Sequence, residues 1–568
     1  IKMRGEEEMI KRILTIIMVV LMIASLTVGC STNNEPASKV EVDKNNLPAI
    51  DQESENEAIN SDIDKEIEEI VMCENYDINT GFTPVFKPSS GWGSFYYLGN
   101  FYETLVNYDN GEIKPGLAKS WEVEGNEITF KLRKGVKFTD GSEFNAEVVK
   151  KNFEMLPIIL GEQITNTFVV LANLEKVEVV DNYTVKLILV KPYYGALQEL
   201  TTVKPMGMTS INAFVEDGLS DEVYSKTFGT GKYMIENAVQ GEDYTFVRNE
   251  NYWGEKPKVK QFVVKTIPDM ESRMMSLRTG EIDMIFGASN ITYDSFSEFE
   301  NDDKFLAKAS ETKVKTKNVT LNTTKAPFDD VNVRLAVQHA IDKQSICDSL
   351  FYGIEEKADY LFNPNLPYCN VSLKPYSYNV EKAKELLDQA GWVEVEGSNV
   401  REKNGQKLKT NILYESGSSS NEDLMLAITG QLKEIGFDID ATGLDIMACW
   451  SKTMSGDFTM FATETYGIPY EPQREIGAMN KPGWHNQVQQ GLSEKKELDL
   501  RINEVSKMAN QDKIQEIYNY ILTTLHDEAV YIPISYQKEL IIFNKEKIKD
   551  YKFNGQPLNI DISGIVPK

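Results

Sequence analysis

The sequence predicts an α/β protein whose folded body is divided into two or more lobes. Segments that alternate like β-strands are interleaved with helical segments along the chain, and no internal repeat is visible. The body that follows the N-terminal region has about 500 residues, which is more than one hydrophobic core usually supports. We therefore expect several α/β units rather than one.

The chain begins with a basic stretch and an apolar run. Lys11 and Arg12 precede the apolar residues 13–26, which is the layout of an export signal and is short for a membrane span. The following Leu-Thr-Val-Gly-Cys, which ends at Cys30, resembles a bacterial lipobox, in which the Cys thiol receives diacylglycerol. We therefore expect residues 1–29 to be a lipoprotein signal peptide and Cys30 to be the lipidated, palmitate-bearing start of the mature protein.

The next segment is polar. Residues 30–66 are rich in Asn, Ser, Glu, Asp and Pro and contain almost no aromatic residues, so they cannot bury enough apolar surface to fold. We expect this segment to be a flexible linker that lets the body sit some tens of ångströms from the membrane.

The composition excludes several classes of function. The formal charge of −27 disfavours binding to nucleic acid, and acidic surfaces usually serve solubility. The five cysteines show no CxxC spacing, so the four beyond Cys30 are expected to be isolated buried thiols rather than disulfides or a zinc site. The chain also lacks a GxSxG elbow, an HExxH motif and a phosphate-binding glycine loop, so we expect no enzyme.

The spacing of apolar residues places the main elements. Helical spacing predicts helices at 145–153, 331–343, 379–390, 421–435 and 512–526. Alternation predicts strands at 128–132, 184–189, 260–267 and 530–535. The last strand lies hundreds of residues from the first ones. If it pairs with them, the chain crosses between lobes twice and a ligand would bind at that hinge.

Several motifs are spread over almost the whole body. They lie at residues 117–121, 128–133, 136–141, 229–231, 247–254, 278–283 and 321–327. Together they resemble the signature of the peptide and nickel class, family 5, of extracytoplasmic solute-binding proteins of ABC transporters. The resemblance implies a two-lobed periplasmic-binding-protein-like fold of class C, with a ligand cleft between lobes that are joined by a two-strand hinge. Its expected parts are residues 67–266 as the first segment of lobe I with a small subdomain, 267–530 as lobe II, and 531–568 as the return segment of lobe I.

Within this family the chain is most similar to the nickel-binding receptors. The similarity is carried by residues 401–406, 466–472, 525–531 and 533–536. It implies a monomeric binding protein on the extracytoplasmic face of the cell membrane. Such a protein captures nickel, or a related divalent metal, as a small organic chelate and delivers it to an ABC permease and ATPase. No prosthetic group is expected, because the metal complex or metallophore is the transported ligand.

The resemblance also implies a set of ligand-binding residues. Its aromatic and basic members are Trp92, Phe95, Tyr96, Lys204, Tyr466, Tyr470 and Arg474. Nickel receptors hold the carboxylates of the chelator with arginines, and the matching positions of this chain are Lys204 and Met454. Arg474, Lys452 and Lys481 are candidate substitutes for the missing arginines, although any of them could simply be solvated.

The resemblance implies that His485 is the metal ligand. Neutral imidazole is a good ligand for Ni(II), and the remaining donors would come from the chelator because one side chain cannot fill the coordination sphere. The spacing around His485 departs from the family pattern, so a loop histidine without a ligand stays an alternative. His339 and His526 are expected to be structural.

Two other functions remain open from the sequence. A di- or oligopeptide receptor of the same fold would hold its ligand by backbone hydrogen bonds and a charged clamp on the termini. We locate no Asp that would capture the peptide amine. The other function is a surface lipoprotein that serves adhesion or sensing.

Overall fold

The structure is a computed structural model that describes residues 65–85, 93–109, 111–165, 168–239, 241, 243–416, 419–467, 469–554 and 559–568. The expected signal peptide, Cys30 and almost all of the expected linker lie outside these residues. All described elements belong to the unit Asp64–Lys568. Across this described part, no helix combines the length and the apolar character needed to cross a membrane.

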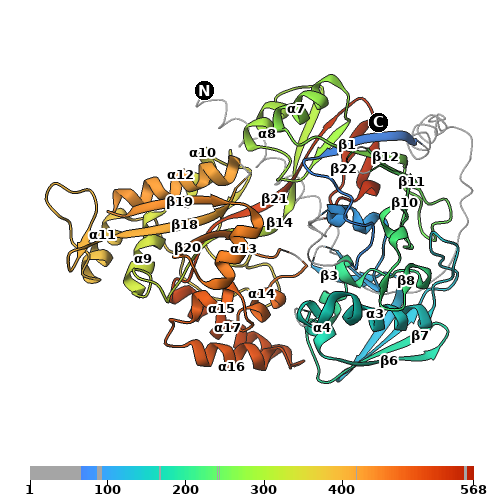
Figure 1. Ribbon diagram of the computed structural model, residues 1–568, viewed down its shortest axis with the longest axis horizontal. Coiled ribbons are helices and arrows are strands. Elements are labelled where there is room, and N and C mark those ends of the chain that lie inside the picture. Colours follow the sequence, from blue (N-terminus) through green and yellow to red (C-terminus); the bar gives the residue numbers. More distant parts are fainter. Residues whose placement is uncertain are drawn as a thin grey trace, which may run out of the picture. The chain divides into compact units, whose positions relative to one another are not determined.

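An 11-stranded mixed sheet is the largest feature of the described residues (Figure 1). Its strand order begins with β10 (Tyr233–Ala238), β11 (Tyr244–Arg248), β12 (Val259–Thr266), β1 (Ile67–Glu74) and β13 (Met284–Phe286). It continues with β21 (Tyr531–Asn544), β14 (Phe305–Leu321), β20 (Met460–Glu464), β18 (Lys409–Glu415) and β19 (Asp438–Leu444), and β15 (Glu356–Lys357) pairs with β21. Elements from both ends of the chain therefore share one sheet.

The two longest strands, β14 and β21, form the centre of this sheet. They pair antiparallel from Phe305 with Asn544 to Thr320 with Tyr531, and the register shifts between Ala309 and Asn318. The predicted strand at 530–535 is the beginning of β21. Residues 531–535 pair with the second half of β14 and not with the N-terminal strands. β21 continues beyond them, and only its residues 541–543 pair with β13, which lies beside β1.

A β-α-β unit leads into the centre of the sheet. β1 pairs in parallel with β12, and the chain between β12 and β13 forms α7 (Met270–Thr279). The Asp269 side chain caps α7 by accepting the Ser272 N–H, and Gly280 ends the helix with φ 78°. The predicted strand at 260–267 is confirmed one residue earlier, as β12.

A smaller antiparallel sheet has its own hydrophobic core. It consists of β4 (Ala118–Glu124), β5 (Glu127–Leu132), β7 (Thr184–Leu189) and β6 (Leu174–Asp181). α3 (Ala146–Thr165) packs against β6 and β7, and its buried Val149 and Phe153 join the core of this sheet. The predicted helix at 145–153 is the first half of α3, and the strands predicted at 128–132 and 184–189 are confirmed.

The C-terminal half is rich in helices. They include α9 (Val331–Ala340), α10 (Lys343–Ser349), α11 (Val380–Gln389), α12 (Ser419–Glu434), α13 (Ile446–Ser455), α16 (Lys495–Val505) and α17 (Gln511–Asp527). Of these, α12 packs against β19 and α13 against β18. The predicted helices 379–390, 421–435 and 512–526 are confirmed within two residues. The helix predicted at 331–343 is wrong at its end, because Asp342 accepts the Ser345 N–H and thereby starts α10.

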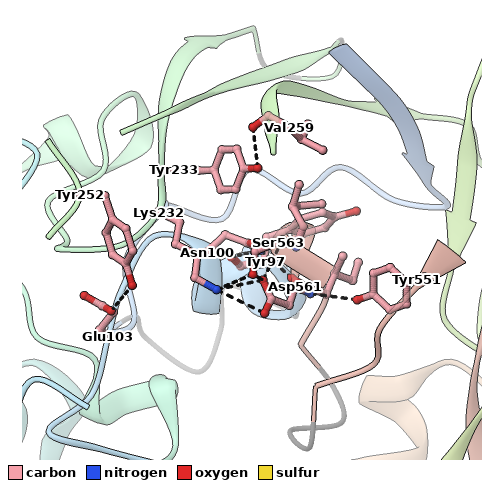
Figure 2. Close-up of polar contacts among 12 residues, drawn as sticks. Tyr97, Asn100, Glu103, Lys232, Tyr233, Tyr252, Val259, Tyr551, Asp561 and Ser563 are labelled. Atoms are coloured by element: carbon pink, nitrogen blue, oxygen red, sulfur yellow. Dashed lines mark hydrogen bonds and ion pairs between the residues drawn. The ribbon is translucent and has the colours of Figure 1, made fainter. Parts of the chain in front are cut away.

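The C-terminal segment is fixed against the N-terminal part of the body (Figure 2). Asn100, at the end of the 3-10 helix η3 (Gly93–Asn100), donates to the Ile560 carbonyl at 2.6 Å and accepts the Ile562 N–H at 3.0 Å. Lys232 donates to the Ser563 hydroxyl at 2.5 Å and lies 3.4 Å from the Asp561 carboxylate. These contacts tie the last residues to η3, which carries two of the predicted ligand residues.

Candidate ligand-binding site

The predicted ligand residues come from three stretches of chain that form two groups. The first group consists of Phe95 and Tyr96 in η3 and Lys204 in α6 (Val203–Met206). The second group lies in the stretch from β20 to α15 (Trp484–Gln489) and contains Tyr466, Tyr470, Arg474 and His485. Trp92 lies outside the described residues.

The two groups of predicted residues lie in parts of the chain that contact each other directly. The Tyr470 hydroxyl donates to the Lys204 carbonyl at 3.4 Å. Gln198, in α5 (Ala196–Glu199), donates its side-chain amide to the carbonyls of Pro469 and Glu471 at 2.7 and 3.0 Å. The fold therefore brings the two predicted groups of residues into one place.

Arg474 lies among three aromatic rings, two from its own stretch of chain and one from Phe168. In α14 (Gln473–Ala478), its guanidinium carbon is 4.4 Å from the ring centre of Phe168, 4.7 Å from Tyr470 and 5.2 Å from Tyr466. Such cation-π contacts fix the plane of the guanidinium while leaving its N–H groups able to bind oxygen. The sequence did not indicate Phe168, whose part in the site depends on tertiary packing.

Lys204 is the second cation of this cluster. Its ammonium lies 5.4 Å from the ring centre of Phe95, which in turn packs edge-on against Tyr96 at 5.3 Å. Burial, and then the charge of Arg474, lower the pKa of Lys204 to about 7. Because two positive charges lie close together in a partly buried aromatic site, an anionic ligand is favoured there.

His485 is enclosed by aromatic side chains and is only 2 % exposed. Its ring stacks on Trp484 with 3.5 Å between centres and meets the ring of Tyr466 edge-on at 5.7 Å. Burial lowers the pKa of His485 to about 3, so the imidazole stays neutral near pH 7. Neutral imidazole is the form that binds a metal ion.

A buried glutamate faces His485. The Nε2 atom of His485 lies 3.2 Å from Oε1 of Glu475, whose other oxygen accepts the Tyr466 N–H at 2.8 Å. Burial, and then the nearby Glu471 carboxyl, hold the pKa of Glu475 well above its usual range. Sequence reasoning missed Glu475, although an acidic residue next to Arg474 in a short helix was the one available signal.

The remaining histidines and cysteines have structural positions. His339 Nδ1 contacts the Ser377 carbonyl at 2.7 Å, and His526 Nε2 contacts the Lys374 carbonyl at 3.0 Å. The four cysteines among the described residues are free and buried, as expected. Nowhere in the described ranges do three or more His, Cys, Asp or Glu side chains gather as metal ligands. A metal held at His485 would therefore need donors from its carrier.

Comparisons with known proteins identify the family. Residues 112–487 match the model for bacterial extracellular solute-binding proteins, family 5. The chain belongs to this family. It is 34% identical to the nickel-binding periplasmic protein of Escherichia coli K12 over 451 residues, which are 78% of this chain and 85% of that protein.

Solved structures of similar proteins share the fold. The NikA protein of Brucella suis, in complex with Fe(III)-EDTA, has a TM-score of 0.83 and 31% identity, and the match covers 88% of this chain and 100% of that one. The DppA protein of Helicobacter pylori, in complex with the peptide STSA, has a TM-score of 0.71 and 24% identity over 89% of this chain and 99% of that one. The chain thus has the two-lobed α/β fold of periplasmic binding proteins.

Proposed function

We propose that this family 5 protein is the substrate-binding lipoprotein of an ABC importer and that it captures nickel, or a related divalent metal, as a small organic chelate. The observation that carries the proposal is the single cluster formed by two cations, Lys204 and Arg474, several aromatic rings and the neutral His485. Each part matches one property of a metal chelate. The cations suit carboxylates, the rings suit flat surfaces and the imidazole suits the metal.

The arrangement of the sheet supports binding by closure of two lobes. We propose that residues 67–266 and 531–568 form lobe I, that 267–530 form lobe II, and that β14 and β21 are the two hinge strands between them. The register of β14 and β21 shifts midway along their length, where few hydrogen bonds would need to change during a bend. Closure would enclose the chelate between Lys204 on one side and Arg474 with His485 on the other.

A thermal-unfolding series tests the function. Purified residues 65–568 are mixed with Ni(II) and L-histidine, with L-histidine alone, or with di- and oligopeptides. We expect the nickel complex to raise the midpoint of unfolding, because a ligand that binds the native state stabilises it by mass action. Stabilisation by peptides, with indifference to every metal chelate, would reverse the proposal.

The peptide receptor is the second candidate. The same two cations could hold the carboxylate of a peptide C-terminus, and the fold is shared with a peptide-bound relative. The series above separates the candidates, since His485 should matter for a nickel complex and not for a peptide carboxylate.

A further inference from the structure

His485 and Glu475 face each other in a fully buried position. His485 is 2 % exposed and Glu475 is 1 % exposed. Their nearest polar atoms, Nε2 and Oε1, are 3.2 Å apart, yet Nε2 has no hydrogen-bond partner among the described residues. The contact is therefore close but does not have the geometry of a hydrogen bond.

The other polar atoms of the two side chains have partners of their own. On the other side of the ring, His485 Nδ1 lies 3.5 Å from the Tyr531 hydroxyl, whose oxygen also accepts an N–H of Gln489 at 2.9 Å. In the tautomer that donates the Nδ1 proton to this oxygen, Nε2 keeps its lone pair. The second oxygen of Glu475 accepts the backbone N–H of Tyr466. Each side chain thus uses one polar atom to fix its position and presents the other to its partner.

The distance suits two ligands of one metal ion. Two donors that each lie about 2.1 Å from an ion, at neighbouring positions of an octahedron or a square, are about 3 Å apart. Such donors point toward the ion rather than toward each other. A contact bent away from hydrogen-bond geometry, as seen between Nε2 and Oε1, is what shared ligation of an ion requires.

We propose that Glu475 is a second protein ligand of the transported metal and binds it together with His485. The protein then supplies one nitrogen and one oxygen at adjacent positions, so the preferred cargo is a divalent ion whose carrier leaves two adjacent positions open. This inference rests on the proposed function and narrows its substrate class.

Calorimetric titration with Ni(II) and one equivalent of L-histidine tests the inference. The variants are H485Q, E475Q and, as a matched control, E74Q. Glu74, in β1, is an equally buried glutamate whose carboxylate accepts the Tyr97 hydroxyl and the Asn290 side-chain amide, both at 2.8 Å. We expect H485Q and E475Q each to weaken binding by about 10- to 100-fold, while E74Q binds like the wild type.

A second readout separates ligation from positioning. The visible absorption bands of bound nickel should shift in E475Q, because an oxygen donor is lost, and should stay unchanged in E74Q. If E475Q does not fold, E475D replaces it, because Asp keeps the carboxyl group but withdraws the oxygen by one methylene group.

Three results would overturn parts of the account separately. No binding of the nickel complex by the wild type would end the proposed function itself. Weak binding by H485Q with normal binding by E475Q would leave the function intact and remove Glu475 as a ligand. Weak binding by E475Q with unchanged nickel bands would make Glu475 a residue that only positions His485.

Discussion

At the residue scale, the charges of the site differ from those that the resemblance implies. The resemblance implies an arginine at the position of Lys204, and Arg474 comes from a different place in the sequence. The two side chains contact different rings, but Arg474 is near enough to lower the pKa of Lys204. A lysine offers charge without the bidentate fork of a guanidinium, so Arg474 is the residue that could bind a carboxylate through two hydrogen bonds.

The lowered pKa of Lys204 predicts a pH-dependent affinity. In the empty protein this pKa is about 7 instead of the ordinary 10.5, so an anionic chelate that raises it must take up a proton above pH 7. We expect affinity to fall between pH 7 and pH 9 and calorimetry in buffers of different ionisation enthalpy to show proton uptake. K204M should abolish both effects.

The same group makes stability depend on pH in a defined direction. Between pH 7 and 10.5 the unfolded chain holds the Lys204 proton and the folded protein does not, so the free energy of unfolding should rise with pH. K204M should flatten this rise, whereas K481M, at an exposed lysine, should leave it unchanged. An identical pH profile for K204M and the wild type would show that Lys204 is not the responsible group.

The sequence could name only some of the residues that lie in this site. Tyr470 belongs to the motif at 466–472, Phe95 was implied by the resemblance, and Arg474 was a candidate substitute for the missing arginines. Glu475 could not be named, since acidic residues in short helices are common. What distinguishes Glu475 is its burial against His485, which depends on how α14 and α15 pack.

At the scale of the elements, local signals predicted most helices and failed where two helices adjoin. Asn379 both precedes and caps α11, so the start of that helix is visible in the sequence. The apolar spacing of α9 continues past Ala340, and only the capping contact of Asp342 separates α9 from α10. A break of this kind depends on side-chain geometry that spacing alone does not show.

The contact of η3 with the C-terminal segment predicts a stability change. N100A removes the partners of the Ile560 carbonyl and the Ile562 N–H, and burying them unpaired should lower the free energy of unfolding by about 2 kcal/mol. Chemical denaturation measures this loss. As a control, N301A, at an exposed helix end, should change it by less than about 0.5 kcal/mol. Equal values for the two variants would show that Asn100 does not fix the segment.

At the scale of the whole molecule, length and alternating elements predicted an α/β body, and the family match confirms its class. The strand pairing that joins residues near position 72 to residues near 542 could not be read from the sequence, because pairing partners hundreds of residues apart leave no local pattern.

Anchoring to the membrane is a prediction for the full chain. If Cys30 is lipidated, C30A should move the protein from the membrane fraction to the soluble fraction after cell lysis. The variant lacks the thiol that carries the acyl chains, and these chains supply the affinity for the membrane. C73S, at a buried thiol of β1, is the control. Unchanged fractionation of C30A would contradict lipidation.

Diffraction at the nickel absorption edge from crystals of residues 65–568 grown with Ni(II) and L-histidine tests the central claim most directly. The account predicts an anomalous peak beside His485, with the organic carrier between Lys204 and Arg474. A site filled by a peptide, or a nickel peak elsewhere with this position empty, would contradict it.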